Sequence, residues 1–362
     1  MYEKVSKAKD FFKKYDRYLT ASALMLGFIV DALTLKRIDQ LYGNLTLISY
    51  LILVSTGIFL IHYFEVRKQG SKYAEKVSQI VPLVIQFAFG GLFSGFTIFY
   101  LRSGSVAASW PFIVILLGLL IGNEMLRKQY ARLIFQITAQ FIAVFFFMIF
   151  FVPVIINSMG AFVFLLSGAI ALLIILLFIS LLNTYIPEQI ERSKKYLTYS
   201  IGSVLVVINI LYFTNLIPPI PLSLKSGGVY HEVSINPTGY VGVKEKRSFW
   251  SKFQIFENMH VVRAKPLYVY SAVFAPTDIK TQIVHHWQLF DTKTNRWVSV
   301  NRIPYLIAGG NDQGYRGYSV KTNLSEGDWR VDVETARGQV IGRIHFEVEF
   351  VHEVPQLERK AL

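Results

Sequence analysis

The chain has seven histidines, the side chains that most often act in proton transfer and metal binding, and no cysteine. The lack of cysteine excludes disulfides, zinc thiolate sites and cysteine nucleophiles from these 362 residues. The histidines show no metal-ligand spacing. His285 and His286 are neighbours on a predicted strand, so their side chains point to opposite faces and cannot hold one metal ion. We therefore expect no metal site.

The sequence also lacks the motifs of several enzyme classes. It contains no Gly-x-Ser-x-Gly elbow and no His-Glu-x-x-His pair. The glycine-rich segment 308–314 is not followed by a helical pattern or by a Lys-Ser/Thr pair, so it does not resemble a nucleotide-binding loop. We expect no cofactor and find no candidate catalytic residue, which favours a protein that is not an enzyme.

Aromatic and guanidinium side chains close to the glycine-rich segment are the candidates for ligand binding. Tyr315, Arg316 and Tyr318 suit stacking against a saccharide or a peptide if they are exposed, although β-sandwich cores use the same aromatic types. His285 alternates with apolar residues on its strand. It is therefore either a hydrogen-bonded core histidine or a functional one, and we expect Trp287 and Trp329 in the core.

Polar residues inside long apolar runs are the candidates for a transport or membrane-enzyme site. Asp31 lies about one helical turn from the expected outer end of its run, so an ion pair with Lys36 or Arg37 is the alternative to a functional role. The glutamines in such runs are neutral, and hydrogen bonds between helices account for them equally well. These tentative membrane-embedded sites are Asp31, Gln86, Gln136 and Gln140.

The composition identifies the first part of the chain as membrane-embedded. Hydrophobic residues make up 53% of the sequence and charged residues only 17%, which is too apolar for a soluble protein. Runs of about 20 residues can cross a bilayer. We predict a cytoplasmic amphipathic N-terminus over 1–17 and a seven-helix transmembrane domain over 18–216, with the lipid bilayer as partner and spans near 18–36, 44–64, 79–101, 106–123, 133–156, 160–184 and 198–216.

The basic residues between these runs predict the topology. On the side of the N-terminus the sequence has sixteen Lys and Arg, and on the other side only Lys36, Arg37 and Arg102. Such an excess marks the cytoplasmic side. Seven spans then put the C-terminal part outside the cytoplasm. Since residues 1–224 account for +9 of the net charge of +13 (19 basic against 10 acidic residues), most of the excess is topological and a nucleic-acid partner is not implied.

A connector over 217–262 is expected to follow the last span, beginning with Ile217-Pro218-Pro219-Ile220-Pro221. Its glycines and prolines leave room for one short strand at Val229–Ile235. Phe249, Trp250, Phe253 and Phe256 are spaced as one helical face beside a basic patch. This segment is either an interfacial helix on the outer leaflet or an edge strand or helix packed on the following domain.

From 263 to 352 the apolar residues alternate with polar ones, which is typical of strands with one buried face. In Asp328–Glu334, tryptophan and valines alternate with charged residues. A two-residue turn at Arg337-Gly338 would place Ala336 opposite Gln339 and Asp332 opposite Arg343. About seven short strands indicate an all-β immunoglobulin-like sandwich, followed by a tail over 353–362. The other strands are expected at Leu267–Phe274, Thr281–Phe290, Arg296–Val300, Tyr315–Thr322 and across Ile344–Phe350.

Several motifs in this region resemble the bacterial domain-of-unknown-function family 2914. They are His285-His286-Trp287, Gly309-Gly310, Tyr315-Arg316-Gly317-Tyr318-Ser319, Gly327-Asp328-Trp329-Arg330-Val331-Asp332-Val333, and Gly338 leading to Phe346-Glu347-Val348. The resemblance covers roughly 260–350. It implies an envelope location and a β domain, and it supplies no catalytic residues.

Two functions are compatible with these patterns. The first is an inner-membrane anchor that presents an extracytoplasmic β-sandwich for binding or sensing an envelope component, such as a glycan, a lipid headgroup or another envelope protein. The alternative is a transporter or lipid-handling protein in which the β domain is a regulatory cap. The sequence does not indicate the oligomeric state.

Overall fold

The computed structural model describes residues 28–35, 41–67, 72–103, 106–125, 132–219, 221–237, 239–246, 257–275, 280–308 and 314–362. The chain forms two compact units, a helical one and a β-rich one, and the second contains Thr214–Leu362 with all the described strands. The amphipathic segment expected at 1–17, the aromatic segment 249–256 and most of the glycine-rich segment lie outside the described residues.

Six of the predicted spans overlap helices, although the last helix begins at Pro187, well before the expected start at 198. The first, 18–36, is described only over 28–35, of which 28–34 is helical. Within the described residues, five helices are long and apolar enough to cross a membrane, while α4 contains the shorter apolar stretch Ala108–Gly122. The helices are α2 Leu41–Arg67, α3 Lys72–Ser103, α4 Val106–Met125, α5 Leu133–Ile156, α6 Ala161–Tyr185 and α7 Pro187–Phe213.

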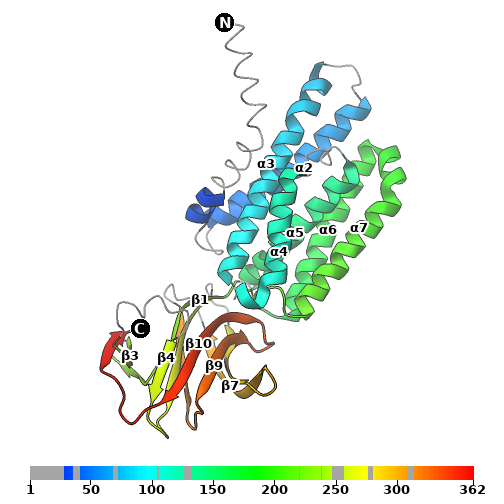
Figure 1. Cartoon of the computed structure of the whole chain (residues 1–362). Coiled ribbons are helices and arrows are strands. Elements are labelled where there is room, and N and C mark those ends of the chain that lie inside the picture. Colours follow the sequence, from blue (N-terminus) through cyan, green and yellow to red (C-terminus); the bar gives the residue numbers. More distant parts are fainter. Residues whose placement is uncertain are drawn as a thin grey trace, which may run out of the picture. The chain divides into compact units, whose positions relative to one another are not determined.

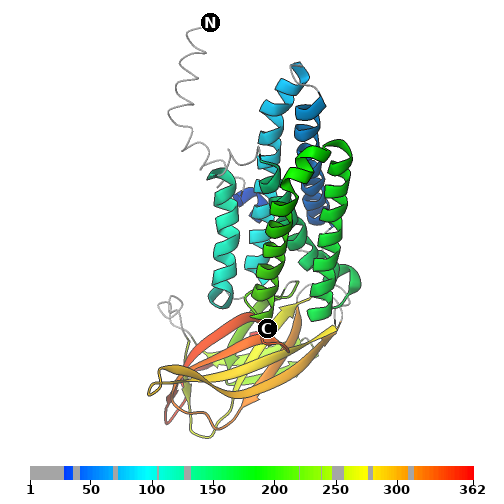
Figure 2. The ribbon, with the colours of Figure 1, turned by 90° about the vertical axis from the view of Figure 1, so that its right-hand side faces the viewer.

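Helix α5 forms the centre of the helical unit, and the long helices run side by side around it (Figure 1, Figure 2). It is the most buried of the five long apolar helices. Aromatic packing joins it to three neighbours and a hydroxyl hydrogen bond joins it to α7. The contacts are Phe146 with Phe96 of α3 and Phe112 of α4, Phe145 with Phe164 of α6, and Thr138 with Ser200 of α7 at 2.9 Å.

The described strands of the β-rich unit form three sheets. Their strand orders are β1-β5-β8, β4-β10-β9-β6-β7 and β11-β3-β2, and all pairs are antiparallel except β4 with β10. The strands are β1 Ser223–Tyr230, β2 Glu232–Asn236, β3 Gly239–Glu245, β4 Glu257–Val261, β5 Leu267–Phe274, β6 Lys280–Asp291, β7 Arg296–Ala308, β8 Tyr315–Lys321, β9 Gly327–Thr335, β10 Val340–Phe350 and β11 Leu357–Ala361.

The main core of this unit lies between the first sheet and the five-stranded sheet. Val229 of β1 and Val269 of β5 pack with residues of β4, β6, β9 and β10 in one apolar cluster. Trp287 and Trp329 are both fully or almost fully buried there, with their rings edge to face at 6.3 Å. The prediction that these tryptophans belong to the core is confirmed.

Strands occupy more of the flanking segments than we expected, since we predicted one short strand at Val229–Ile235 in the connector and none in the tail. The expected connector 217–262 contains β1, β2, β3 and β4, and the expected tail 353–362 contains β11, which pairs with β3. The glycines of β1 and the charged residues of β11 hide the alternation by which strands are recognised. Within 263–352 the described residues form six strands, β5 to β10, against the expected number of about seven, and the additional strands lie in the flanking segments.

The hairpin between β9 and β10 differs from the prediction only near its turn. Asp332 faces Arg343 as predicted. Thr335 rather than Ala336 pairs with Gln339, and a bulge lies between Val340 and Gly342. Gly338 has a φ of +86°, which suits a three-residue turn with a residue in the left-handed region. The bulge then restores the predicted register.

Candidate functional site

The glutamines of the apolar helices have partners within the helical unit. Gln136 Oε1 lies 2.8 Å from Nε2 of His62, and both side chains are buried. Gln140 donates to the Leu51 carbonyl at 3.1 Å and to Ser55 Oγ at 2.9 Å. These contacts join α5 to α2, as expected for interhelical hydrogen bonds. Gln86 is buried in α3, and Asp31 is half-buried. The ion pair expected for Asp31 involves residues outside the described ones.

His285 lies in the interior of the β-rich unit and is 0% exposed. Its Nε2 is 2.7 Å from Ser271 Oγ of β5, and its Nδ1 is 2.8 Å from Ser319 Oγ of β8. Trp287, which can only donate, bonds to the same Ser319 oxygen at 3.0 Å. All donors are satisfied if the Ser319 hydroxyl donates to Nδ1 of His285 and the Nε2–H of His285 donates to the Ser271 hydroxyl. This arrangement fits the core histidine rather than a site open to ligands.

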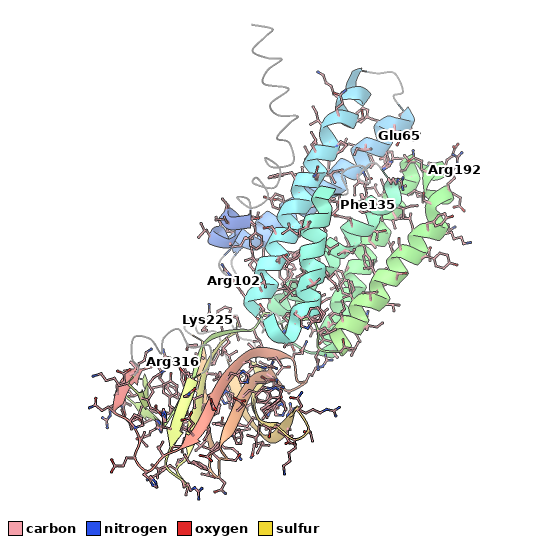
Figure 3. The ribbon with its side chains drawn as sticks, viewed as in Figure 1. Glu65, Arg102, Phe135, Arg192, Lys225 and Arg316 are labelled. Carbon is pink, nitrogen blue, oxygen red and sulfur yellow. The ribbon has the colours of Figure 1, made fainter. Side chains whose placement is uncertain are left out.

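Tyr315, Arg316 and Tyr318 do not form one cluster. All three are half-buried on β8. Tyr315 packs on an apolar core cluster, while alternation puts the other two on the opposite face. There the Tyr318 ring contacts Tyr240 and Tyr268. Arg316 lies toward β3 (Figure 3), and its carbonyl accepts a hydrogen bond from the Tyr240 hydroxyl.

A denser group of polar side chains lies on the outer face of the five-stranded sheet, opposite the tryptophan core. We call this group the polar face. Its members come from β6, β7, β9 and β10 and are cross-strand neighbours in the sheet register. They are His286, Gln288, Trp297, Arg302, Arg330, Asp332, Glu334, Arg343 and His345.

Asp332 organises one half of the polar face. It is 3% exposed and accepts two hydrogen bonds from Arg343, at 2.6 and 2.8 Å. It also accepts a hydrogen bond from Gln288 Nε2 at 3.3 Å. Gln288 Oε1 in turn accepts hydrogen bonds from Nε and Nη2 of Arg330, at 3.0 and 2.7 Å. The Arg330 guanidinium lies 4.4 Å above the Trp297 ring. The result is a continuous chain from Arg343 to Trp297 that fixes the position of each group.

Glu334 organises the other half. Its side chain is 5% exposed and its Oε1 lies 2.6 Å from Arg302 Nη2 and 3.3 Å from His286 Nδ1. Burial raises the pKa of Glu334 to about 7; Arg302 opposes this rise and Asp332 adds to it. Burial and Arg302 also lower the pKa of His286. Glu334 therefore changes protonation near neutral pH.

Replacing Glu334 by glutamine is expected to stabilise the β-rich unit at pH 8. The folded carboxyl keeps its proton up to about pH 7, whereas the unfolded one has the model value of 4.5. Stability from this group is thus fully present below pH 4.5 and is lost as the pH rises through 7. Glutamine does not ionise and so avoids that loss. We therefore expect the free energy of unfolding of the variant to exceed that of the parent chain by on the order of 1–2 kcal/mol at pH 8, and by little at pH 5.

Hydrogen exchange of β9 peptides in the full chain measures this difference. Glu358→Gln is the control, because Glu358 is exposed on β11. An equal effect of Glu334→Gln at pH 5 and pH 8 would contradict the prediction.

A second carboxylate cluster joins β3 to β4. Glu245 contacts His231 Nε2 at 3.0 Å and accepts the His260 Nδ1 and backbone N–H at 2.8 Å each. Burial alone would raise the pKa of Glu245, but these hydrogen bonds lower it. Among the residues that the structure describes, no group of three or more His, Asp or Glu side chains is arranged to hold a metal ion. The cluster is an internal ion-pair network.

Sequence patterns pointed to parts of the polar face without assembling it. Alternation places Arg330, Asp332 and Glu334 on the outward side of their strand, and His286 opposite to His285. The missing information was the strand order, since β9 lies between β10 and β6, and β7 joins the outer edge. Charged side chains on the outward faces of several predicted strands of one domain are the signal that would have suggested this site.

Comparison with known proteins supports the resemblance for the C-terminal region. Residues 280–348 match the family model described as "Protein of unknown function (DUF2914)". This match contains β6, β7, β8 and β9 and most of β10, and so all members of the polar face. A search of curated proteins gives no match.

Two solved structures show only remote similarity. A β-glucosidase from Listeria innocua in complex with gluconolactone has 16% identity and a TM-score of 0.19, with 31% of this chain and 16% of that chain covered. The alkylpurine DNA glycosylase AlkC of Pseudomonas fluorescens, bound to DNA containing an abasic site analog, has 7% identity and a TM-score of 0.24, with 86% of this chain and 99% of that chain covered. TM-scores this low do not establish a shared fold.

Proposed function

We propose that this chain, whose β-rich unit carries the DUF2914 match, is a bacterial inner-membrane protein that binds an envelope component through the polar face. The observation that carries this proposal is the chain of fixed groups from Arg343 to Trp297. Rigid strands position arginine, amide and aromatic groups together, which is the combination that recognition sites use. A glycan is the ligand class that suits such groups best.

The helical unit supports the membrane part of this proposal. Among the residues that the structure describes, five helices have the length and apolar composition of membrane spans. Arg67, at the end of α2, lies 5.9 Å from the Tyr185 ring at the end of α6. Glu65 and Arg192 lie at the same end of the helical unit (Figure 3). Basic residues that flank different helices thus share one end, as the proposed cytoplasmic side requires.

The β-rich unit supports the second part. Two sheets that face each other around a tryptophan-rich core are compatible with an immunoglobulin-like sandwich, to which the third sheet is an addition. Such a unit needs no cysteine to fold if its core is large enough. It would act outside the cytoplasm and bind ligands on the outer face of the five-stranded sheet.

A reporter fused after Leu362 tests the location. Because β1 already begins at Ser223, a fusion at the C-terminus preserves the β-rich unit. We expect activity from a reporter that functions only outside the cytoplasm. Activity of a reporter that functions only in the cytoplasm would refute the proposed topology.

Binding is tested with the full chain in nanodiscs of zwitterionic lipid. Peptidoglycan fragments, lipopolysaccharide and envelope extract are the probes. We expect one of them to bind, and Trp297→Ala to abolish this binding, while Leu357→Ala on β11 leaves it unchanged. The proposal fails if no probe binds, or if both variants bind like the parent chain.

A further inference from the structure

The polar face contains three arginines but only two buried carboxylates. Arg343 forms a bidentate pair with Asp332, and Arg302 contacts Glu334. Arg330 instead bonds through Nε and Nη2 to the neutral oxygen of Gln288. Within the described residues, Gln288 is the only side chain that accepts a hydrogen bond from Arg330. Its guanidinium is therefore the cation of the face without a bonded carboxylate.

The position of Arg330 is fixed on both sides. Trp297 stacks below the guanidinium, and Gln288 is itself held by Asp332 and by a 3.1 Å contact with His286. A guanidinium held in one orientation loses little freedom when it binds a ligand, which favours affinity. Burial lowers the pKa of Arg330 and the nearby Arg343 adds to this effect, while Asp332 opposes it only in part. An anion at this point would relieve the unfavourable environment of the charge.

We infer that Arg330 binds the acidic group of a carboxylate-bearing saccharide on the polar face. This inference rests on the proposed function and names its ligand class. A planar guanidinium with unused donors matches a carboxylate in geometry and charge. The surroundings match a sugar, since the Phe290 and His345 rings lie 5.2 and 4.9 Å from the Trp297 ring and the exposed Ser299 hydroxyl bonds His286.

A matched pair of saccharides isolates the contribution of the charge. The full chain in zwitterionic nanodiscs is titrated with galacturonate tetrasaccharide and with its methyl ester, which has the same rings without the charge. We expect the acid to bind roughly tenfold more tightly or better. Binding of the acid is also expected to weaken as the salt concentration rises.

Three variants connect this difference to one side chain. Arg330→Gln should reduce binding of the acid to the level of the ester, and Arg330→Lys should restore only part of it because the fork geometry is lost. Arg359→Gln removes the same charge from an exposed position on β11 and should have no effect. Hydrogen exchange of β9 verifies that each variant is folded.

The outcomes separate this inference from the proposed function. Equal binding of acid and ester, or full binding by folded Arg330→Gln, overturns the inference. The proposed function survives that result if Trp297→Ala still abolishes binding of an envelope probe. Competition by phosphatidylglycerol vesicles that depends on Arg330 in the absence of saccharide binding would also overturn the inference, because the ligand would then be a lipid headgroup.

Discussion

Asp332→Ala is expected to lower the free energy of unfolding of the β-rich unit by about 3–5 kcal/mol. The carboxylate is 3% exposed and is the acceptor for Arg343 and Gln288. Its removal leaves the Arg343 guanidinium half-buried without an anion and close to Arg330, a second cation. Gln288 also loses its anchor, so the position of Arg330 should become less defined.

Hydrogen exchange of β6, β9 and β10 peptides in the full chain measures this loss without requiring the two units to unfold together. Asp328→Ala is the control on the same strand. Asp328 is exposed, so its replacement should change stability by less than about 0.5 kcal/mol.

A double variant distinguishes the loss of the carboxylate from the cost of a stranded cation. Replacing Asp332 and Arg343 together by leucine and methionine removes both charges from the sheet. We expect the double variant to be more stable than Asp332→Ala, because breaking a buried pair costs more than replacing it with apolar residues. An Asp332→Ala variant that matches Asp328→Ala in stability would show that Asp332 is not the organising group.

The same network shows how far sequence reasoning reaches. The pairing of Asp332 with Arg343 follows from alternation and a turn, both of which are local. The turn itself was predicted with one residue too few. Gly338 adopts a positive φ, and the compensating bulge near Ile341 leaves no mark in the pattern of apolar residues. Local signals therefore fixed the register of the hairpin but not the details of its end.

Features that depend on contacts between distant segments could not be predicted. The polar face joins β6 and β7 to β9 and β10, and only the order of strands in the sheet brings His286, Arg302 and Glu334 together. Tyr315, Arg316 and Tyr318, which we predicted together as tentative ligand-binding residues, are separated for a related reason. These residues are close in sequence, but strand alternation sends Tyr315 to the other face.

Replacing His285 by glutamine is expected to change the pH dependence of the stability of the β-rich unit. Burial lowers the pKa of His285 to about 3, whereas an unfolded histidine has a pKa of about 6.5. The folded state thus binds fewer protons than the unfolded state between these values. Stability from this group is present above pH 6.5 and is lost as the pH falls toward 3.

The expected loss from His285 is about 2 kcal/mol between pH 6.5 and pH 5. Glu334 acts in the opposite direction over part of this range, because its folded pKa of about 7 lies above the unfolded value. The pH-dependent contributions of the two groups to stability therefore partly cancel in the parent chain. Its stability should vary less with pH than it would with either group alone. His286 and His345, whose pKa values are also lowered by burial, act in the same direction as His285.

His285→Gln should reveal the contribution of Glu334. Glutamine retains a donor and an acceptor for Ser271 and Ser319 but takes up no proton. Relative to the parent chain, the variant should therefore gain about 2 kcal/mol of stability on passing from pH 6.5 to pH 5, whatever its stability at pH 8.

Hydrogen exchange of β5 and β6 peptides in the full chain over this range provides the measurement. Leu357→Ala, at an exposed position on β11, removes no titratable group and should give a profile parallel to that of the parent chain. A parallel profile for His285→Gln as well would mean that His285 takes up its proton without unfolding, and that Ser319 can turn to accept it.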